Sequence, residues 1–206
     1  MLVHGGHGSC LHWQRNLEAL SGAHELWLVD LPSYGDSDAP GESSRDPRRM
    51  PELIDRVYRG LDDLLGPDTS VNMGAFSFGG VVASQVAMRR GGVRKLALLG
   101  TAGLGGLRRQ PTALQEWNWP DRARRRAALR NNLVAMMVQA PEAADEQAVD
   151  IHEASCLRTR FHSRPISMGS SVPETLQARI EPTLLVWGEH DVTCDQHTGI
   201  GKQRCQ

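Results

Sequence analysis

The chain has 206 residues, of which 40% are hydrophobic and 23% are charged. This length and composition suit one globular domain with a small appended subdomain and exclude disordered and collagen-like classes. Lysine and arginine number 23 against 24 acidic residues, a net charge of -1, so there is no overall attraction to nucleic acid or anionic lipid. No apolar run approaches the roughly 20 residues that cross a bilayer, and the N-terminus lacks a secretory signal pattern. We therefore expect a cytoplasmic protein without membrane or nucleic-acid partners.

The cysteines are scattered along the chain without a C-x-x-C pair, which indicates neither a zinc site nor a disulfide framework. We expect structural or incidental roles for them, and no metal or organic cofactor. They are Cys10, Cys156, Cys194 and Cys205.

Short apolar runs rich in leucine and valine predict buried parallel strands. They lie at residues 26–29, 71–75, 96–99 and 183–187. Apolar residues from Leu53 to Leu65 keep to one face of a helix that Gly66-Pro67 terminates, and residues 81–90 predict a second helix, closed by a glycine pair. Strands that alternate with helices predict an α/β fold whose mostly parallel sheet is covered on both faces.

From residue 107 to residue 170 the sequence is rich in arginine and alanine, with a helical pattern and no convincing strand. We expect a helical cap inserted into a core formed by residues 1–106 and 171–206. Its arginines predict a solvated helix face rather than a phosphate-binding patch, because no aromatic stacking platform accompanies them and acidic residues follow. The arginines are Arg122, Arg124, Arg125, Arg126 and Arg130, and the acidic residues are Glu142, Asp145 and Glu146.

The segment from Val71 to Gly80 carries the clearest chemical signal, because an apolar strand runs into a tight turn at Ser77 and then into a helix. Small residues, Ala75 and Gly79, flank the serine at two positions before and after it. A nucleophile on a sharp strand-to-helix turn needs such neighbours, since bulky ones would collide with adjacent strands. The helix start also supplies amide hydrogens and the positive end of a dipole. The pattern departs mildly from G-x-S-x-G at Ala75 and predicts Ser77 as a nucleophile.

A glycine-rich loop, His4-Gly5-Gly6-His7-Gly8, directly follows the apolar start of the chain. Glycines let a backbone approach a substrate and direct amides at a developing oxyanion. Alone, such a loop is equally typical of a phosphate loop or a plain turn. Beside Ser77 it favours an oxyanion-binding loop, with His4 and Gly5 as candidates for contacting substrate.

With two further motifs, the chain resembles the α/β-hydrolase superfamily, and within it the capped serine esterases and the hydrolases of carbon–carbon bonds in meta-cleavage products. The further motifs are Asp30-Leu-Pro-Ser-Tyr-Gly-Asp-Ser37 and Trp187-Gly-Glu-His-Asp191, each after a predicted strand. We interpret Asp30 and Asp36 as structural turn residues. The resemblance implies a doubly wound sheet of the α/β-hydrolase type and a Ser-His-Asp triad.

The same resemblance implies particular site residues. In this family the first loop and the residue after the nucleophile donate the oxyanion-hole amides, which points to Gly6 and Phe78. The loop after the late strand carries the acid of the triad, which points to Asp191 ahead of its neighbours Glu189 and Asp195. A carboxylate is needed there because it fixes the tautomer of the catalytic histidine.

The family places that histidine on a loop after a further strand, well beyond the acid. Only residues 192–206 follow Asp191, and they contain neither an apolar strand nor the usual Gly-His turn. The family also has strands ahead of the first glycine-rich loop, whereas His4 stands near the start of this chain. The sequence therefore predicts a chain cut short at both ends, lacking the first strands and the last strand and helix. His197, which follows Asp191, is the candidate base.

Missing outer strands would leave the strands at 26–29 and 183–187 as uncovered apolar edges. Such edges favour edge-to-edge pairing and aggregation. We therefore expect poor solubility or self-association into a homo-oligomer.

These features predict a serine hydrolase that acts on an ester, or on an activated carbon–carbon bond, of a small and largely apolar substrate. The alternative is a catalytically inactive fragment or ligand-binding protein of the same fold, which the missing histidine segment favours. Haloalkane dehalogenases and epoxide hydrolases are disfavoured because those relatives carry aspartate where this chain has Ser77. A P-loop or dinucleotide enzyme is disfavoured because its glycine motif occurs at no strand-to-helix turn.

Substrate choice is expected to depend on the cap. Trp117 and Trp119 are candidates for lining an apolar pocket, with packing inside the cap as the alternative. Arg158, Arg160 and Arg164 are candidates for binding a substrate carboxylate, with solvated or salt-bridged arginines as the alternative.

Overall fold

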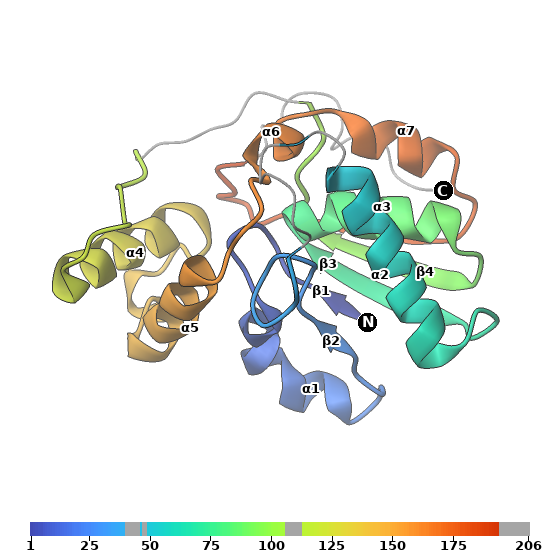
Figure 1. Ribbon diagram of the computed structural model, residues 1–206, viewed down its shortest axis with the longest axis horizontal. Helices are drawn as coiled ribbons and strands as arrows, with labels where there is room; N and C mark the ends of the chain where they lie inside the picture. The colour runs from blue at the N-terminus through green and yellow to red at the C-terminus, as the bar shows by residue number, and fades with distance from the viewer. Residues whose placement is uncertain (40–45, 47–48, 106–112, 194–206) are drawn as a thin grey trace.

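The computed structural model of the chain describes residues 1–39, 46, 49–105 and 113–193, and Figure 1 shows how its elements are arranged. The strands are β1 (Leu2–Val3), β2 (Leu28–Val29), β3 (Val71–Phe76), β4 (Val93–Leu99) and β5 (Thr183–Val186). The α-helices are α1 (Leu17–Ser21), α2 (Arg49–Leu65), α3 (Phe78–Arg89), α4 (Arg122–Met136), α5 (Glu146–Leu157), α6 (Arg164–Ser167) and α7 (Ser171–Gln177). Two short 3-10 turns are η1 (Cys10–Asn16) and η2 (Pro141–Ala143).

The strands and helices predicted from apolar runs are all present, with shifted ends. The run at 26–29 contributes only Leu28 and Val29 to β2, whereas β4 begins three residues before the predicted run, at Val93. Helix α2 forms because its apolar residues recur on one buried face. It ends where Gly66 takes a positive φ of 85° and its amide donates to the Asp62 carbonyl oxygen at 2.8 Å.

The sheet is parallel throughout, with strand order β2-β1-β3-β4-β5. The chain runs from β1 outward to β2, returns past β1 to β3, and then continues to β4 and β5. Because crossovers between parallel strands are right-handed, η1 and α1 cover one face of the sheet, and α2, α3 and α7 cover the other. The strand order reverses between β1 and β3. In doubly wound sheets the crevice at the carboxyl ends of such strands is where ligands bind.

Helix α3 is packed most tightly against the sheet, and its residues from Phe78 to Ser84 are all buried. A side chain at Gly79 would overlap the His4 carbonyl oxygen and would stand 2.8 Å from that of Val3. Glycine therefore allows α3 to rest directly on the end of β1. This close approach brings the start of α3 against the loop that follows β1.

Helices α4 and α5 lie side by side at one end of the molecule, away from the sheet (Figure 1). They have a small apolar cluster of their own, which includes Leu133, Ala144 and Val149. Phe161, by contrast, packs into the main core. The division into a core (1–106 and 171–206) and a cap (107–170) remains a prediction.

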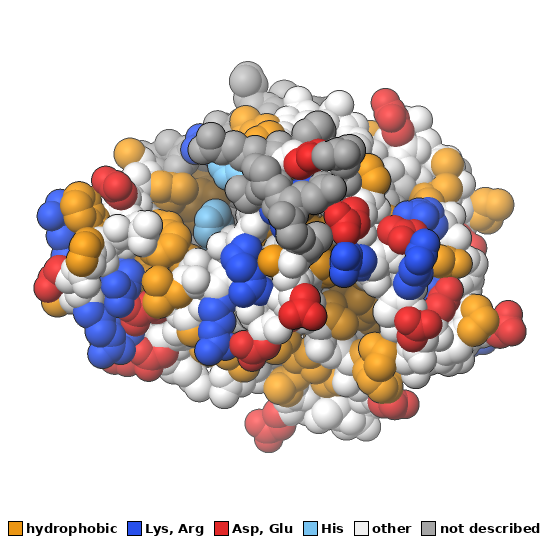
Figure 2. All heavy atoms as spheres, viewed as in Figure 1, with side chains coloured by type: hydrophobic (Ala, Val, Ile, Leu, Met, Phe, Trp, Pro, Cys, Tyr) orange, Lys and Arg blue, Asp and Glu red, His pale blue; other side chains and the backbone are white. Residues whose placement is uncertain are grey.

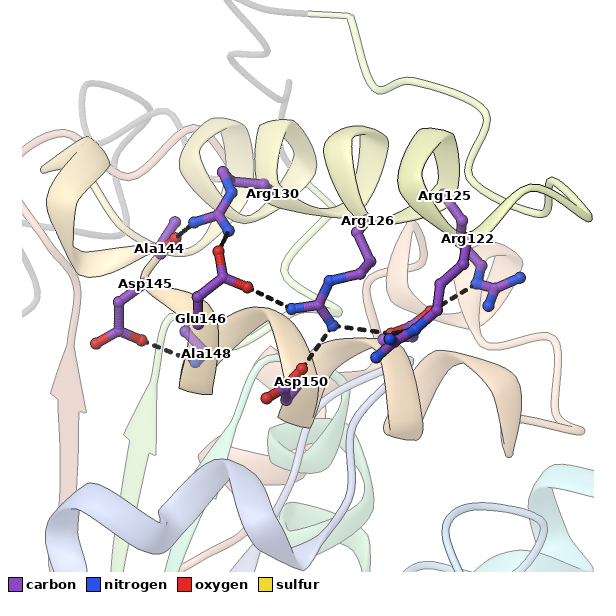
Figure 3. A network of polar contacts seen from close by, with 10 residues as sticks. Arg122, Arg125, Arg126, Arg130, Ala144, Asp145, Glu146, Ala148 and Asp150 are labelled. Carbon is purple, nitrogen blue, oxygen red and sulfur yellow. Dashed lines mark hydrogen bonds and ion pairs between the residues drawn. The ribbon is translucent and has the colours of Figure 1, made fainter.

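Arg125, Arg126 and Arg130 of α4 face α5 and pair with its carboxylates, which corrects the expectation of a solvated helix face for these three arginines (Figure 3). Arg122 and Arg124 are exposed, as expected. The Arg126 guanidinium contacts three carboxylates of α5, those of Glu146 at 2.6 Å, Asp150 at 2.5 Å and Glu153 at 3.0 Å. Arg125 reaches Glu153 at 2.7 Å. The charge run therefore joins two helices by ion pairs.

Strands β2 and β5 are the outer strands of the described sheet, in agreement with the predicted edges. On β5 the side chains of Leu184 and Val186 are 60% and 40% exposed. Self-association through this edge remains a prediction. Across the described ranges, no helix is long and apolar enough to cross a membrane.

Candidate active site

Ser77 occupies the turn between β3 and α3 in a conformation that few side chains adopt. Its φ of 52° and ψ of -118° lie on the positive-φ side, where non-glycine residues are strained. Its amide donates to the Leu99 carbonyl oxygen at 3.0 Å, and its own carbonyl oxygen accepts from Gly80 at 2.9 Å and Ala102 at 3.1 Å. These bonds hold the sharp turn that the sequence predicts.

The glycine-rich loop after β1 lies directly on this turn. A Cβ added to Gly5 would stand 3.1 Å from the Ser77 Cβ, and one added to Gly6 would stand 3.8 Å from the Phe78 Cβ. The loop is itself closed by a hydrogen bond from the Gly8 amide to the Gly5 carbonyl oxygen at 3.2 Å. The structure thus brings together the predicted nucleophile and the two residues predicted to form the oxyanion hole.

Asp191 lies on the far side of the turn, beyond the carboxyl end of β4. Its Oδ2 is 3.2 Å from the position of a Cβ on Gly100, the residue after β4. Its Oδ1 accepts hydrogen bonds from the Thr193 amide at 2.7 Å and the Thr193 hydroxyl at 2.6 Å. Ser77 follows β3 and Asp191 follows β5, the two strands on either side of β4. Both residues lie at the carboxyl end of β4, because the Leu99 carbonyl oxygen accepts from the Ser77 amide and Asp191 lies beside Gly100. Asp195 and the candidate base His197 lie outside the described residues.

His4 is completely buried, with 0% of its surface exposed, and both of its ring nitrogens face the backbone. Its Nε2 accepts from the Leu31 amide at 3.0 Å, and its Nδ1 lies 2.8 Å from the Gly5 carbonyl oxygen. These partners assign the proton to Nδ1. Burial lowers the pKa of His4, although the bond to Gly5 opposes this. Contact with substrate is therefore not supported, and we reinterpret His4 as the residue that fixes the loop.

The two tryptophans proposed to bind substrate lie in different surroundings. The Arg124 guanidinium carbon lies 3.3 Å from the centroid of the Trp119 ring. The Trp119 indole N–H donates to the Glu116 carbonyl oxygen at 2.7 Å. These contacts favour packing of Trp119 at the start of α4. Trp117 meets the His7 ring edge-on, at 6.4 Å between ring centroids. It thus lies beside the glycine-rich loop. Figure 2 shows a hollow with hydrophobic and histidine side chains between the α4–α5 pair and the sheet.

Asp30 and Asp36 have the structural roles predicted for them. The Asp30 carboxylate accepts from the amides of Cys10 at 2.7 Å and Asp36 at 3.0 Å. Asp36 pairs with Arg158 at 2.6 Å, and Arg160 donates to backbone carbonyl oxygens of the same turn. These two arginines line a polar pocket of about 320 Å³ with residues 35–39. The ion pair of Arg158 and the backbone bonds of Arg160 favour structural roles over binding of a substrate carboxylate.

Sequence reasoning missed a pair of buried histidines, His12 of η1 and His152 of α5, whose ring centroids are 5.9 Å apart. Neither nitrogen of His12 has a partner among the described residues. Burial, followed by repulsion from His4, lowers the pKa of His12 to about 4. Burial, followed by repulsion from His12, lowers the pKa of His152 to about 3. Within the described parts of the chain, no three potential metal-ligating side chains are grouped to hold an ion.

A parallel doubly wound sheet with a serine on a strained strand-to-helix turn defines an α/β protein of the hydrolase type. A model of the alpha/beta hydrolase family matches residues 1–204. The chain belongs to this family.

Solved structures share the fold at low sequence identity. An esterase from Rhodococcus sp. ECU1013 is 21% identical with a TM-score of 0.68, and the match covers 94% of this chain and 73% of that one. The meta-cleavage product hydrolase CumD from Pseudomonas fluorescens IP01 is 20% identical with a TM-score of 0.72, covering 93% and 72%. A putative aryl esterase from Burkholderia cenocepacia is 18% identical with a TM-score of 0.68, covering 93% and 71%. No curated protein sequence matches the chain.

Proposed function

We propose that the chain is a serine hydrolase that acts on an ester, or on an activated carbon–carbon bond, of a small and largely apolar substrate. The observation that carries the proposal is the strained backbone of Ser77, whose φ is 52°, on the turn between β3 and α3. Backbone strain of about 1–3 kcal/mol persists mainly where function requires it. Membership of the hydrolase family and the esterase neighbours support the reaction class.

In the proposed reaction the Ser77 hydroxyl oxygen attacks the substrate carbonyl carbon, while His197 takes the hydroxyl proton. The amides of Gly6 and Phe78 donate hydrogen bonds to the oxyanion that forms. The tetrahedral intermediate collapses to an acyl-enzyme, and the leaving group takes the proton from His197. Water then attacks the acyl carbon with the same assistance and releases the acid and free Ser77.

Asp191 is proposed to orient the histidine. Its Oδ1 is engaged by Thr193, whereas no donor from the described residues reaches Oδ2, which faces Gly100. A carboxylate held on one oxygen in this way has a fixed orientation and an acceptor left for an imidazole N–H. This arrangement supports Asp191 as the acid over Glu189, which is exposed.

Turnover of p-nitrophenyl acetate tests the proposal. We expect Ser77→Ala and His197→Ala to lower kcat by about a thousandfold or more, because members of a triad act as a unit. Asp191→Asn should lower kcat by about a hundredfold or more. The matched control is Glu189→Gln, which should leave kcat unchanged. Turnover that persists in Ser77→Ala would contradict the proposal, and a chain without Ser77-dependent turnover would support the inactive alternative.

A further inference from the structure

Ser163 is a buried serine on the segment that leads from α5 back to the main core, far from Ser77 in the sequence. It is only 5% exposed and stands at the first position before α6, where serine hydroxyls usually accept a hydrogen bond from the helix backbone. Here the hydroxyl makes no such bond. It faces the glycine-rich loop instead, with its Oγ 2.6 Å from the position of a Cβ on Gly6.

The backbone that carries Ser163 is held firmly in place. The Arg160 amide donates to the Ser33 carbonyl oxygen at 2.8 Å, and the Arg160 carbonyl oxygen accepts from the buried Arg49 side chain at 3.1 Å. The Arg49 guanidinium also lies over the Phe161 ring, 5.1 Å from its centroid. The hydroxyl of Ser163 is therefore presented to Gly6 from a rigid support.

The Tyr34 ring packs against residues of the same region. The Tyr34 ring is edge-on to His4 at 5.1 Å and lies 6.2 Å from Phe78. Burial raises the pKa of the Tyr34 phenol, and the Ser163 hydroxyl opposes the rise, although the two groups do not reach hydrogen-bonding geometry. Tyr34, His4 and Phe78 thus pack together beside the glycine-rich loop, and the Ser163 hydroxyl occupies the space next to Gly6.

We propose that Ser163 is a positioning residue, whose hydroxyl fixes Gly6 so that its amide points at the oxyanion. This inference rests on the proposed function. In this account, the segment that follows α5 completes the oxyanion hole. A displacement of α4 and α5 would move Ser163 and thereby shift the Gly6 amide relative to the substrate. A misplacement of about 1 Å in a site of this kind costs about a hundredfold in rate.

The rate of Ser77 labelling by a fluorophosphonate tests this role, because the reagent places negative charge in the oxyanion hole. We expect Ser163→Ala to lower the maximal labelling rate about tenfold or more, with little change in the concentration for half-maximal rate. Ser155→Ala is the matched control, since Ser155 is buried in the same region and bonds Ser9 at 2.8 Å. It should lower the unfolding midpoint similarly but leave the labelling rate unchanged.

A second pair of variants tests the contact itself. Gly6→Ala introduces a methyl group that collides with the Ser163 hydroxyl, and we expect it to slow labelling about a hundredfold. Adding Ser163→Gly removes the collision, and the double variant should be labelled at least about tenfold faster than Gly6→Ala alone. Labelling of Ser163→Ala at the wild-type rate, or no recovery in the double variant, would overturn the role of Ser163 alone. A wild-type chain that is never labelled at Ser77 would overturn the proposed function, and this role with it.

Discussion

At the scale of single residues, the strained backbone of Ser77 lowers the stability of the fold at the position of the proposed nucleophile. A residue with a φ of 52° stores about 1–3 kcal/mol of strain unless it is glycine. The Ser77 amide donates to the Leu99 carbonyl oxygen, and the Ser77 carbonyl oxygen accepts from the Gly80 and Ala102 amides, and these bonds hold it there. Relief of that strain should therefore be measurable as a gain in stability.

Ser77→Gly is expected to raise the free energy of unfolding by about 1 kcal/mol relative to Ser77→Ala. Both variants lack the nucleophile, but only glycine adopts the positive φ without a Cβ penalty. For a chain of this size, 1 kcal/mol corresponds to about 2–4 °C in Tm. Thermal unfolding of the two variants measures the difference. A lower Tm for Ser77→Gly would show that the turn is not strained.

The local sequence pattern predicted Ser77, because the small residues that such a turn needs lie within two positions of it. Gly6 and Phe78 were implied by the resemblance to the α/β-hydrolase family. The structure places these three residues close together. Ser163 has no such pattern, since its role depends on a contact with Gly6 that only the folded chain creates. The sequence placed His4 in the glycine-rich loop, but it could not show that the imidazole is completely buried against the Leu31 and Gly5 backbone.

At the scale of elements, ion pairs join α4 to α5, and the carboxylates that form them differ widely in their exposure to solvent. The Glu153 side chain is only 8% exposed and contacts Arg125 and Arg126. The Glu146 side chain is 74% exposed, although it contacts Arg126 and Arg130. Breaking a buried pair leaves an uncompensated charge, whereas an exposed pair contributes little.

Glu153→Gln is therefore expected to lower the free energy of unfolding by about 3 kcal/mol. Glu146→Gln, the matched control, should lower it by less than about 1 kcal/mol. Urea denaturation followed by circular dichroism measures both values. Equal losses in the two variants would show that burial of Glu153 does not govern the stability of the pair.

The elements themselves were largely predictable, because buried parallel strands are continuous apolar runs and α2 shows clear helical periodicity. The packing of α4 against α5 could not be predicted from the sequence. The arginines of α4 have helical spacing, but nothing in the sequence shows that Glu153 and Asp150 lie opposite them. Which face of a charged helix meets a neighbour depends on tertiary packing.

At the scale of the whole molecule, the buried histidines make stability depend on pH. The folded pKa values of His12, about 4, and His152, about 3, lie below the ordinary value of 6.5. The unfolded chain therefore binds more protons than the folded chain between these values and pH 6.5. The free energy of unfolding should therefore be highest above pH 6.5. It should fall as the pH decreases from 6.5 toward the folded pKa values, and the total loss for His12 should be on the order of 3 kcal/mol.

Urea unfolding at about pH 7 and about pH 5 measures this loss. His152→Gln should reduce the difference between the two pH values, because one of the groups that must be protonated is removed. The exposed His24 provides the matched control, and His24→Gln should leave the difference as it is in the wild-type chain. An unchanged difference in His152→Gln would contradict the assignment.

The most direct test of the central claim, that Ser77 is the nucleophile of a hydrolase, is the mass of the intact chain after treatment with a fluorophosphonate. We predict one adduct per chain, mapped by peptide analysis to Ser77 and absent from Ser77→Ala. The control Ser84→Ala, which removes a buried serine of α3, should label as the wild-type chain does. No adduct, or an adduct that persists in Ser77→Ala, would contradict the claim.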